Sequence, residues 1–226
     1  MNQDNFILEL KKLNINITEL QLKQLERYYE LLVEYNKVMN LTGITEKEEV
    51  YLKHFYDSLT IAKVIDLNNY ETLCDVGTGA GFPGLVLKIL YPNLKVTLLD
   101  SLNKRLNFLN VVIKELNLKD VETVHSRAEE YNKKFDITVA RAVAPLNILL
   151  EYCIPLTKVN GYFIAMKGKN EESNNALLKL DSEIIETNSF LLPIENSDRT
   201  IIKIKKLKET NKKFPRKYSE IKKNPL

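Results

Sequence analysis

Cysteine and histidine are scarce in this sequence, which has two of each among 226 residues. Cys74 and Cys153 are too few for a disulfide framework and do not form a CxxC motif, and His54 and His125 lie far apart. We therefore expect neither a disulfide nor a bound metal. Both cysteines are expected to be core residues.

Long hydrophobic runs are also absent. No apolar stretch approaches the roughly 18 residues that a membrane span requires, and Met1–Asn5 lacks the basic-then-apolar order of a signal peptide. With 44% hydrophobic and 28% charged residues, the chain has an ordinary globular composition. We expect a soluble, cytoplasmic protein with one main domain and no membrane partner.

The charge is unevenly distributed, although the net charge is only +3. Residues 201–226 contain ten Lys or Arg against two Glu, a net charge of +8, which leaves −5 on residues 1–200. Such a basic tail is either a solvated, solubilising run or a surface that contacts a polyanion such as nucleic acid.

Residues 1–65 have helical patterns. Thr18–Gln21 is a capping-box sequence that precedes apolar residues at helical spacing, and Thr45–Glu48 is a second. The turn-like sequence Asn40–Gly43 lies between them. Because an amphipathic helix needs a surface that buries its apolar stripe, we interpret residues 1–65 as a helical cap that packs on the segment after it.

From about residue 70, short β-branched runs alternate with helical stretches. The candidate parallel strands are Glu71–Val76, Lys95–Asp100, Val121–Ser126, Phe135–Ala140 and Gly161–Lys167, with Ala144–Pro155 as a candidate helix. This alternation predicts a parallel sheet covered by helices. Two further runs, Glu183–Leu192 and Thr200–Leu207, have a short connection and are expected to pair in antiparallel fashion.

A glycine-rich turn follows the first candidate strand. Gly77, Gly79 and Gly81 permit a sharp turn and let a ligand approach the backbone closely. Pro83 is suited to the first turn of the next helix. Because a dinucleotide fingerprint needs glycine where this chain has Phe82, the spacing favours S-adenosylmethionine over a dinucleotide.

The order of these elements predicts an α/β, Rossmann-like class I methyltransferase fold. Its sheet is expected to be mostly parallel and seven-stranded, with an antiparallel last strand. The helical cap (1–65) precedes an S-adenosylmethionine-binding core (66–208), and a basic tail (209–226) follows it.

Two carboxylates flank the glycine turn. Asp100 ends the second candidate strand, where a carboxylate is well placed to accept hydrogen bonds from both ribose hydroxyls of a cofactor. Asp75 either contacts the amino-acid end of the cofactor or anchors the turn by accepting backbone hydrogen bonds. We expect Gly77, Gly79 and Asp100 to contact the cofactor.

Charged residues follow three further strands, and in open α/β sheets ligands lie across these strand ends. In Arg127-Ala128-Glu129, the acid is placed to hold an adenine amino group or is a solvated residue at a helix start. Arg141 follows the fourth strand and Lys167 the fifth. Each is either a surface ion-pair partner or part of a site for a polyanionic or carboxylate ligand.

In these segments the sequence resembles the small-subunit ribosomal RNA guanine-N7 methyltransferases, also called the glucose-inhibited division protein B family. The resemblance covers most of the chain and rests on Asn40–Thr42, His54–Leu59, Asp75–Gly84, Lys104–Arg105, Phe108–Leu109, Arg127–Glu129, Phe135–Asp136, Arg141–Ala142, Lys167–Gly168 and Pro215–Lys217. It implies that S-adenosylmethionine is contacted by Gly77, Phe82, Ala128, Glu129 and Arg141. In the tail, the family usually has glycine where this chain continues with Tyr218.

The implied reaction is in-line transfer of a methyl group to N7 of a specific guanine in 16S ribosomal RNA. N7 has a lone pair and no proton to lose, so no catalytic base is expected. The reaction then depends on aligning the methyl donor with N7, and such positioning lowers the activation barrier by roughly 7–11 kcal/mol in well-oriented model systems. N7 faces the deep, narrow major groove of A-form RNA, so we expect an unstacked or loop guanine, with Arg141 or Phe82 stacked on it.

The expected RNA or substrate contacts are Lys53, His54, Asp57, Lys104, Arg105, Arg141, Lys167 and Arg216. His54 and Asp57 share a helical face of the cap and either line the RNA side or form a pair that ties the cap to the core. The expected partner is 16S ribosomal RNA or the small ribosomal subunit, and the chain is expected to be monomeric. If the tail binds RNA, deletion of residues 209–226 should weaken RNA binding and leave cofactor affinity unchanged.

Two alternatives stay open at this point. The first is a methyltransferase that acts on a small molecule or a protein, with a merely solubilising tail. The second is a nucleotide-cofactor-binding module without catalysis, or an NAD oxidoreductase. Titration with adenosylhomocysteine and NAD separates the second alternative from a methyltransferase.

Overall fold

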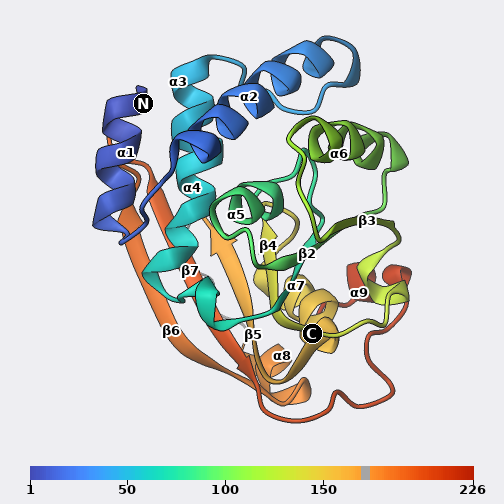
Figure 1. Ribbon diagram of the computed structural model, residues 1–226. Helices are drawn as coiled ribbons and strands as arrows, with labels where there is room; N and C mark the ends of the chain where they lie inside the picture. Colours follow the sequence, from blue (N-terminus) through green and yellow to red (C-terminus); the bar gives the residue numbers. More distant parts are fainter. Residues whose placement is uncertain (169–173) are drawn as a thin grey trace.

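Seven strands form one sheet, in the order β3-β2-β1-β4-β5-β7-β6, in the computed structural model, which describes residues 1–168 and 174–226 (Figure 1). The strands are β1 (Thr72–Val76), β2 (Lys95–Asp100), β3 (Val121–His125), β4 (Phe135–Arg141), β5 (Thr157–Lys167), β6 (Ser182–Leu191) and β7 (Asp198–Lys206). Strands β1 to β5 are parallel, and β7 runs antiparallel to both β5 and β6. The predicted fold class is confirmed.

Strand β5 begins four residues earlier than the sequence pattern predicts, at Thr157 and not at Gly161. Its pairing with β4 shifts register between Phe135 and Ile137, and Asn160 has a φ of +64°. The dipeptide Asn160-Gly161 therefore has the sequence of a turn but forms a β-bulge inside a longer strand.

Helices cover both faces of the sheet (Figure 1). One face carries α5 (Gly84–Leu90) and α6 (Asn103–Glu115), and the other carries α7 (Leu146–Cys153), α8 (Asn174–Lys179) and α9 (Tyr218–Lys223). Such two-sided burial is why the residues of β1, β2 and β4 are mostly buried, whereas those of the edge strand β3 are half-buried or exposed. Cys74 and Cys153 are fully buried in the second of these layers, so their prediction as core residues is confirmed.

The N-terminal helices form a cap on the first layer. They are α1 (Gln3–Lys12), α2 (Glu19–Met39), α3 (Lys47–Val50), the π-helical turn η1 (Tyr51–Tyr56), α4 (Asp57–Leu59), and the 3₁₀ turns η2 (Thr60–Lys63) and η3 (Leu67–Asn69). Helix α2 contacts α5 and α6, and α4 contacts α5. Apolar residues of the cap and of the core belong to one hydrophobic cluster, so the apolar stripes of the cap helices are buried as predicted. The division at residues 65 and 208 stays a prediction.

One of the two predicted capping boxes forms. The Thr18 hydroxyl accepts a hydrogen bond from the backbone N of Gln21, whose side chain accepts one from the backbone N of Thr18. The prediction for Thr45 is wrong, because the first hydrogen bond of α3 runs from Val50 N to Glu46 O and the helix begins one residue later.

The basic tail folds back onto the core. Phe214 and Ile221 are buried in the cluster around α7, and Arg216 forms an ion pair with Glu151 of that helix. Part of the tail is therefore packed structure and not a solvated run.

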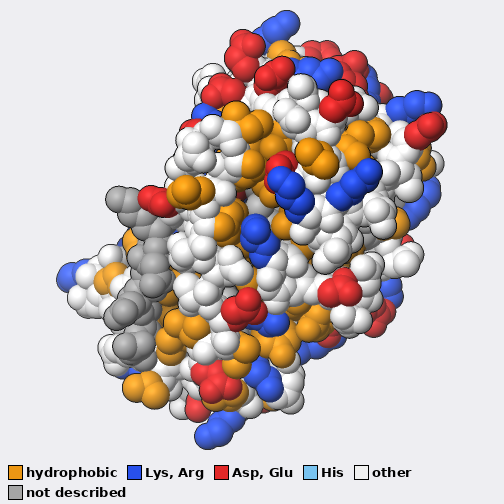
Figure 2. All heavy atoms as spheres, turned by 90° about the vertical axis from the view of Figure 1, so that its left-hand side faces the viewer, with side chains coloured by type: hydrophobic (Ala, Val, Ile, Leu, Met, Phe, Trp, Pro, Cys, Tyr) orange, Lys and Arg blue, Asp and Glu red, His pale blue; other side chains and the backbone are white. Residues whose placement is uncertain are grey.

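The surface mixes charged and apolar side chains. Figure 2 shows the face at the left of Figure 1, where basic, acidic and hydrophobic side chains are interspersed. Across residues 1–168 and 174–226, none of the helices combines the length and the apolar character needed to cross a lipid bilayer.

Candidate active site

The glycine turn after β1 has a backbone conformation that favours glycine. Gly77, Gly79 and Gly81 have φ angles of +72°, +59° and +99°, all in the left-handed region. The backbone N of Gly77 donates to Leu99 O over 2.8 Å, which ties the turn to the end of β2. A Cβ on Gly77 would lie 2.7 Å from Cγ2 of Val143, so any side chain there would fill the space in front of the turn.

Asp75 anchors this turn from within the core. Its Oδ2 accepts hydrogen bonds from the Thr78 hydroxyl over 2.7 Å and from the backbone N of Gly84 over 2.8 Å. Burial raises the pKa of Asp75 to about 6. The anchoring role is confirmed, and a contact with the cofactor stays a prediction. Pro83 occupies the N-cap of α5 and not the predicted first turn, because the helix begins at Gly84.

Asp100 lies at the end of β2, beside the turn, and its side chain is almost fully buried. Its Oδ2 accepts a hydrogen bond from Gly79 N, and its Oδ1 accepts one from Leu102 N, each over 2.9 Å. Arg105 Nη1 lies 3.3 Å from Oδ2. A carboxylate has about four acceptor positions, so Oδ1 keeps one for a hydroxyl donor. This geometry leaves room for one ribose hydroxyl and not for the two that the sequence predicted, and the contact itself stays a prediction.

A cavity of ≈ 390 Å³ lies in front of these strand ends. Its lining includes Gly77, Asp100, Ala128, Glu129, Val143, Tyr152, Tyr218 and Lys222. Oε1 of Glu129 is buried and has no hydrogen-bond partner within the described part of the chain, and burial raises the pKa of this carboxyl. Because a buried acceptor without a partner is costly, this oxygen fits a ligand that brings an N–H donor, as adenine does. We call this space the cofactor cavity.

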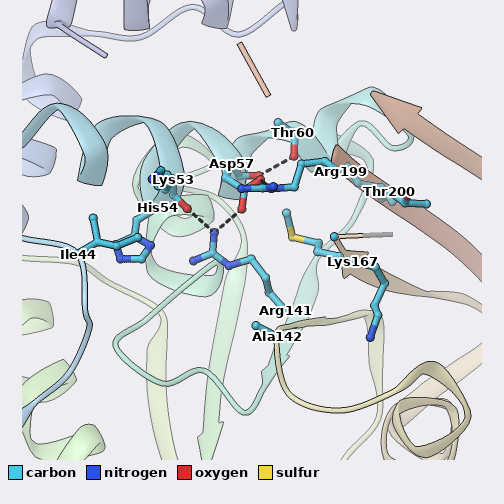
Figure 3. Close-up of a pocket in the computed structure, with 13 residues that line it drawn as sticks. Ile44, Lys53, His54, Asp57, Thr60, Arg141, Ala142, Lys167, Arg199 and Thr200 are labelled. Atoms are coloured by element: carbon cyan, nitrogen blue, oxygen red, sulfur yellow. Dashed lines mark hydrogen bonds and ion pairs between the residues drawn. The ribbon is translucent and has the colours of Figure 1, made fainter. Parts of the chain in front are cut away.

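A second cavity, of ≈ 350 Å³, adjoins the cofactor cavity at Ala142, which lines both. It lies between the cap, the carboxyl ends of β4 and β5, and the start of β7 (Figure 3). It brings together most of the predicted RNA contacts, namely Lys53, His54, Asp57, Arg141 and Lys167, and adds Arg199. Four of these residues are cations and one, Asp57, is a carboxylate, although Lys53 also pairs with Glu49 over 2.8 Å and with Glu195 over 3.3 Å. The lining itself is therefore basic and favours an anionic ligand. We call it the basic cavity.

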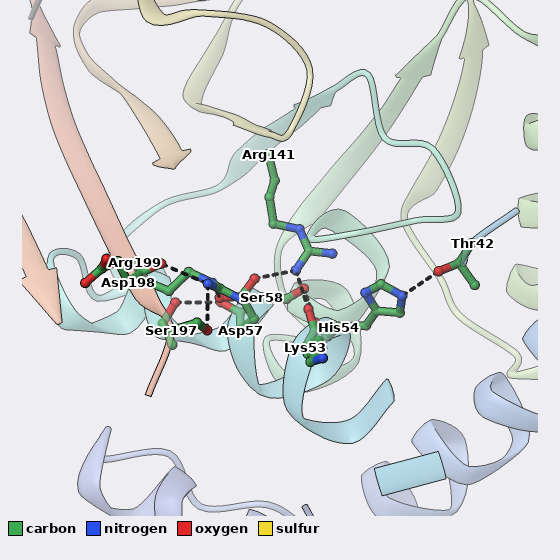
Figure 4. A network of polar contacts seen from close by, with 10 residues as sticks. Thr42, Lys53, His54, Asp57, Ser58, Arg141, Ser197, Asp198 and Arg199 are labelled. Atoms are coloured by element: carbon green, nitrogen blue, oxygen red, sulfur yellow. Dashed lines mark hydrogen bonds and ion pairs between the residues drawn. The ribbon is translucent and has the colours of Figure 1, made fainter. Parts of the chain in front are cut away.

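Asp57 holds two guanidinium groups at the wall of the basic cavity (Figure 4). Arg141 Nη1 donates to its Oδ2 and Arg199 Nε to its Oδ1, each over 2.9 Å. The side chains of Asp57, Arg141 and Arg199 are 8%, 13% and 22% exposed. Arg141 Nη1 also donates to Lys53 O over 3.1 Å. The carboxylate thus ties the cap to the core, but through arginines and not through the predicted pair with His54.

His54 stacks on Phe82 beside this network. The two ring centroids lie 4.4 Å apart with an interplanar angle of 18°, and His54 Nε2 lies 2.8 Å from the Thr42 hydroxyl. Burial, together with the nearby charge of Arg141, lowers the pKa of His54 to about 4. The imidazole is therefore neutral at pH 7. Phe82 is buried, lies 5.4 Å from the Arg141 guanidinium, and is not part of the cofactor-cavity lining, so its contacts with cofactor or base stay predictions.

Three predicted RNA contacts lie outside the basic cavity. Lys104 is exposed at the start of α6. Arg105 lines the cofactor cavity and pairs with Asp100. Arg216 pairs with the buried Glu151. The structure therefore gives Arg105 and Arg216 partners within the protein, and RNA contacts from all three stay predictions.

Arg199 and Tyr218 are cavity residues that the sequence did not reveal. Arg199 lies near the start of β7, and because β7 is antiparallel to β5, its next residue Thr200 pairs with Lys167 at the end of β5. The antiparallel pairing predicted from sequence contained this signal, since the start of an antiparallel strand lies where the parallel strands end. No comparable signal places Tyr218, which reaches its site through the fold of the tail.

Comparison with known proteins identifies the family of this chain. A family model described as rRNA small subunit methyltransferase G matches residues 21–202. Curated relatives of that name from Bacillus cytotoxicus and Macrococcus caseolyticus are 51% and 49% identical, and each alignment covers 100% of this chain and 99% of the relative.

Solved structures with low sequence identity share the fold. A StiE O-MT segment matches with a TM-score of 0.59 at 10% identity, over 78% of this chain and 82% of that one. A mutant of MtNAS in complex with S-adenosylmethionine matches with a TM-score of 0.57 at 14% identity, over 84% and 73%. The full-length similarity to the curated relatives goes further than the fold, and this chain belongs to the rRNA small subunit methyltransferase G family.

Proposed function

We propose that this S-adenosylmethionine-dependent methyltransferase modifies N7 of a specific guanine in 16S ribosomal RNA. The observation that carries the proposal is the pair of adjoining cavities. One presents carboxylate acceptors suited to a nucleoside cofactor, and the other presents cations suited to RNA. They meet at Ala142, where donor and acceptor would come together.

The cofactor cavity supports binding of S-adenosylmethionine through two carboxylates. Asp100 offers the remaining acceptor position on Oδ1 to a ribose hydroxyl. Glu129 offers the buried Oε1 to the adenine amino group. The left-handed turn at Gly77 leaves the backbone open to the ligand. When bound, S-adenosylmethionine supplies the methyl group from its sulfonium centre.

The basic cavity supports positioning of the target nucleotide. Arg141, Arg199, Lys53 and Lys167 surround it and would neutralise backbone phosphates as RNA enters. N7 of guanine needs no deprotonation, so the residues here have only to orient the base and exclude water. His54 suits this role because burial keeps its pKa at about 4 and the ring neutral.

The proposed partner is the small ribosomal subunit or its 16S ribosomal RNA, in the cytoplasm, with the enzyme as a monomer. The name of the curated relatives refers to the same class of RNA.

Transfer of labelled methyl groups tests this function. Purified protein would be given methyl-labelled S-adenosylmethionine with either naked 16S ribosomal RNA or small subunits from cells that lack the enzyme. We expect label in the RNA of at least one substrate, and much less with Arg141→Gln. Label only in protein or in small molecules, or no label in the RNA of either substrate, would contradict the proposal.

A further inference from the structure

The C-terminal helix α9 reaches the cofactor cavity. Tyr218 and Lys222 of this helix line the same ≈ 390 Å³ cavity as Asp100 and Glu129. The core from β1 to β7 already forms the sheet and most of the cavity walls, yet one side of the cavity is built by the tail. The tail therefore has a position from which it can contact a bound cofactor.

An ion pair fixes the segment just before α9. The Glu151 carboxylate accepts three hydrogen bonds from Arg216: from its backbone N over 2.9 Å, from Nε over 2.8 Å and from Nη2 over 2.6 Å. Glu151 is fully buried on α7. A bidentate guanidinium–carboxylate pair has strict geometry, and the added backbone bond fixes the main chain as well. Ile221 of α9 is also fully buried, in the hydrophobic cluster around α7.

The ring of Tyr218 lies over the segment that carries Glu129. The guanidinium of Arg127 is 4.1 Å from the ring centroid, and this arginine is two residues from the acid whose Oε1 is buried without a partner in the described structure. Tyr152 of α7 lines the same cavity. Two tyrosines thus border the place where the acceptor for an adenine N–H lies, as aromatic walls do in nucleoside sites.

We propose that Tyr218 is a cofactor-binding residue that packs against the nucleoside end of S-adenosylmethionine, and that the Arg216–Glu151 ion pair positions it. The proposal rests on the cofactor assignment and not on the identity of the RNA. It gives the tail a role in cofactor affinity, whereas the sequence pattern alone predicts that its deletion leaves this affinity unchanged.

Calorimetric titration of the full chain with S-adenosylhomocysteine, without RNA, tests the contact. We expect Tyr218→Ala to raise the Kd about tenfold, since loss of an aromatic contact has this size, while Tyr218→Phe stays near the wild-type Kd. Lys223→Ala is the matched control, because Lys223 is on the same helix but outside the cavity lining. A wild-type Kd for Tyr218→Ala, in a protein with an unchanged Tm, would overturn the proposal.

A double-mutant cycle tests whether the Arg216–Glu151 ion pair positions Tyr218. Arg216→Gln should raise the Kd for S-adenosylhomocysteine, and adding Tyr218→Ala to it should raise the Kd by much less than Tyr218→Ala does alone, because the ring has already lost its position. If the factors by which the two substitutions raise the Kd simply multiply, the positioning role of the ion pair is overturned, even if Tyr218 itself contacts the cofactor. Because no RNA is present, these outcomes are separate from a failure of the methyl-transfer experiment.

Discussion

Replacing Asp57 by Asn removes the charge that two guanidiniums share. The carboxylate is 8% exposed and its partners Arg141 and Arg199 are 13% and 22% exposed, so water screens the three charges poorly. Removal of one partner from such a buried pair costs about 3–5 kcal/mol. For a chain of this size, each kcal/mol shifts the Tm by about 2–4 °C. We therefore expect Asp57→Asn to lower the Tm by at least about 6 °C.

Thermal and urea unfolding of the wild type and of Asp57→Asn measure this loss of stability. Glu30→Gln is the matched control, because Glu30 also pairs with an arginine but both side chains are about half exposed, and such surface pairs contribute only about 0.2–1 kcal/mol. Asp57→Asn should also weaken methyl transfer, since the amide keeps one acceptor oxygen and replaces the other by an NH2 donor, so one of the two guanidiniums loses the acceptor that orients it. Equal stability of Asp57→Asn and Glu30→Gln would show that the buried ion-pair network contributes no more than an exposed pair, which would contradict this prediction.

Three further predictions follow from burial and backbone geometry. Gly81→Ala should lose at least about 1–2 kcal/mol of stability because its φ is +99°, whereas Gly43→Ala, which meets no neighbour within 4 Å, should unfold near the wild-type urea midpoint. His54 has a pKa of about 4 in the native state against 6.5 in the unfolded chain, so its contribution to stability is complete above pH 6.5 and is lost as the pH falls towards 4. The stability difference between His54→Gln and wild type should therefore change by about 2 kcal/mol between pH 7 and pH 5, and an unchanged difference would contradict the burial of this imidazole. Burial raises the pKa of both Cys74 and Cys153, so a thiol reagent should label them only after unfolding, and rapid labelling of native protein would show that these sites open.

The parallel sheet was predictable from sequence because its signals are local. Each strand is a short apolar run beside a helical stretch, and the turn at Gly77 has a spacing that only a few backbone paths satisfy. Asp100 could be placed because it ends a strand whose neighbours are fixed by the fold. The start of β5 was missed because a bulge at Asn160 has the sequence of a turn.

The partners of the charged residues could not be predicted in the same way. Arg216 has the sequence context of an exposed basic tail, yet it reaches Glu151, 65 positions earlier in the chain. Asp57 and His54 were expected to act together, but the π-helical turn before Asp57 and the return of β7 bring arginines to the carboxylate. Such pairings depend on long-range packing, and no local pattern specifies them.

The atom that receives the methyl group is the most direct test of the proposed function. Small subunits from cells that lack the enzyme would be methylated by purified protein, and the nucleosides of their 16S ribosomal RNA would be separated and identified by mass spectrometry. We expect 7-methylguanosine at one position of the RNA, and none when S-adenosylmethionine is omitted. A methyl group on an exocyclic amine, a ribose hydroxyl or a pyrimidine carbon would contradict the proposed reaction, because methylation of those acceptors needs a base or a nucleophile, whereas methylation of N7 needs neither.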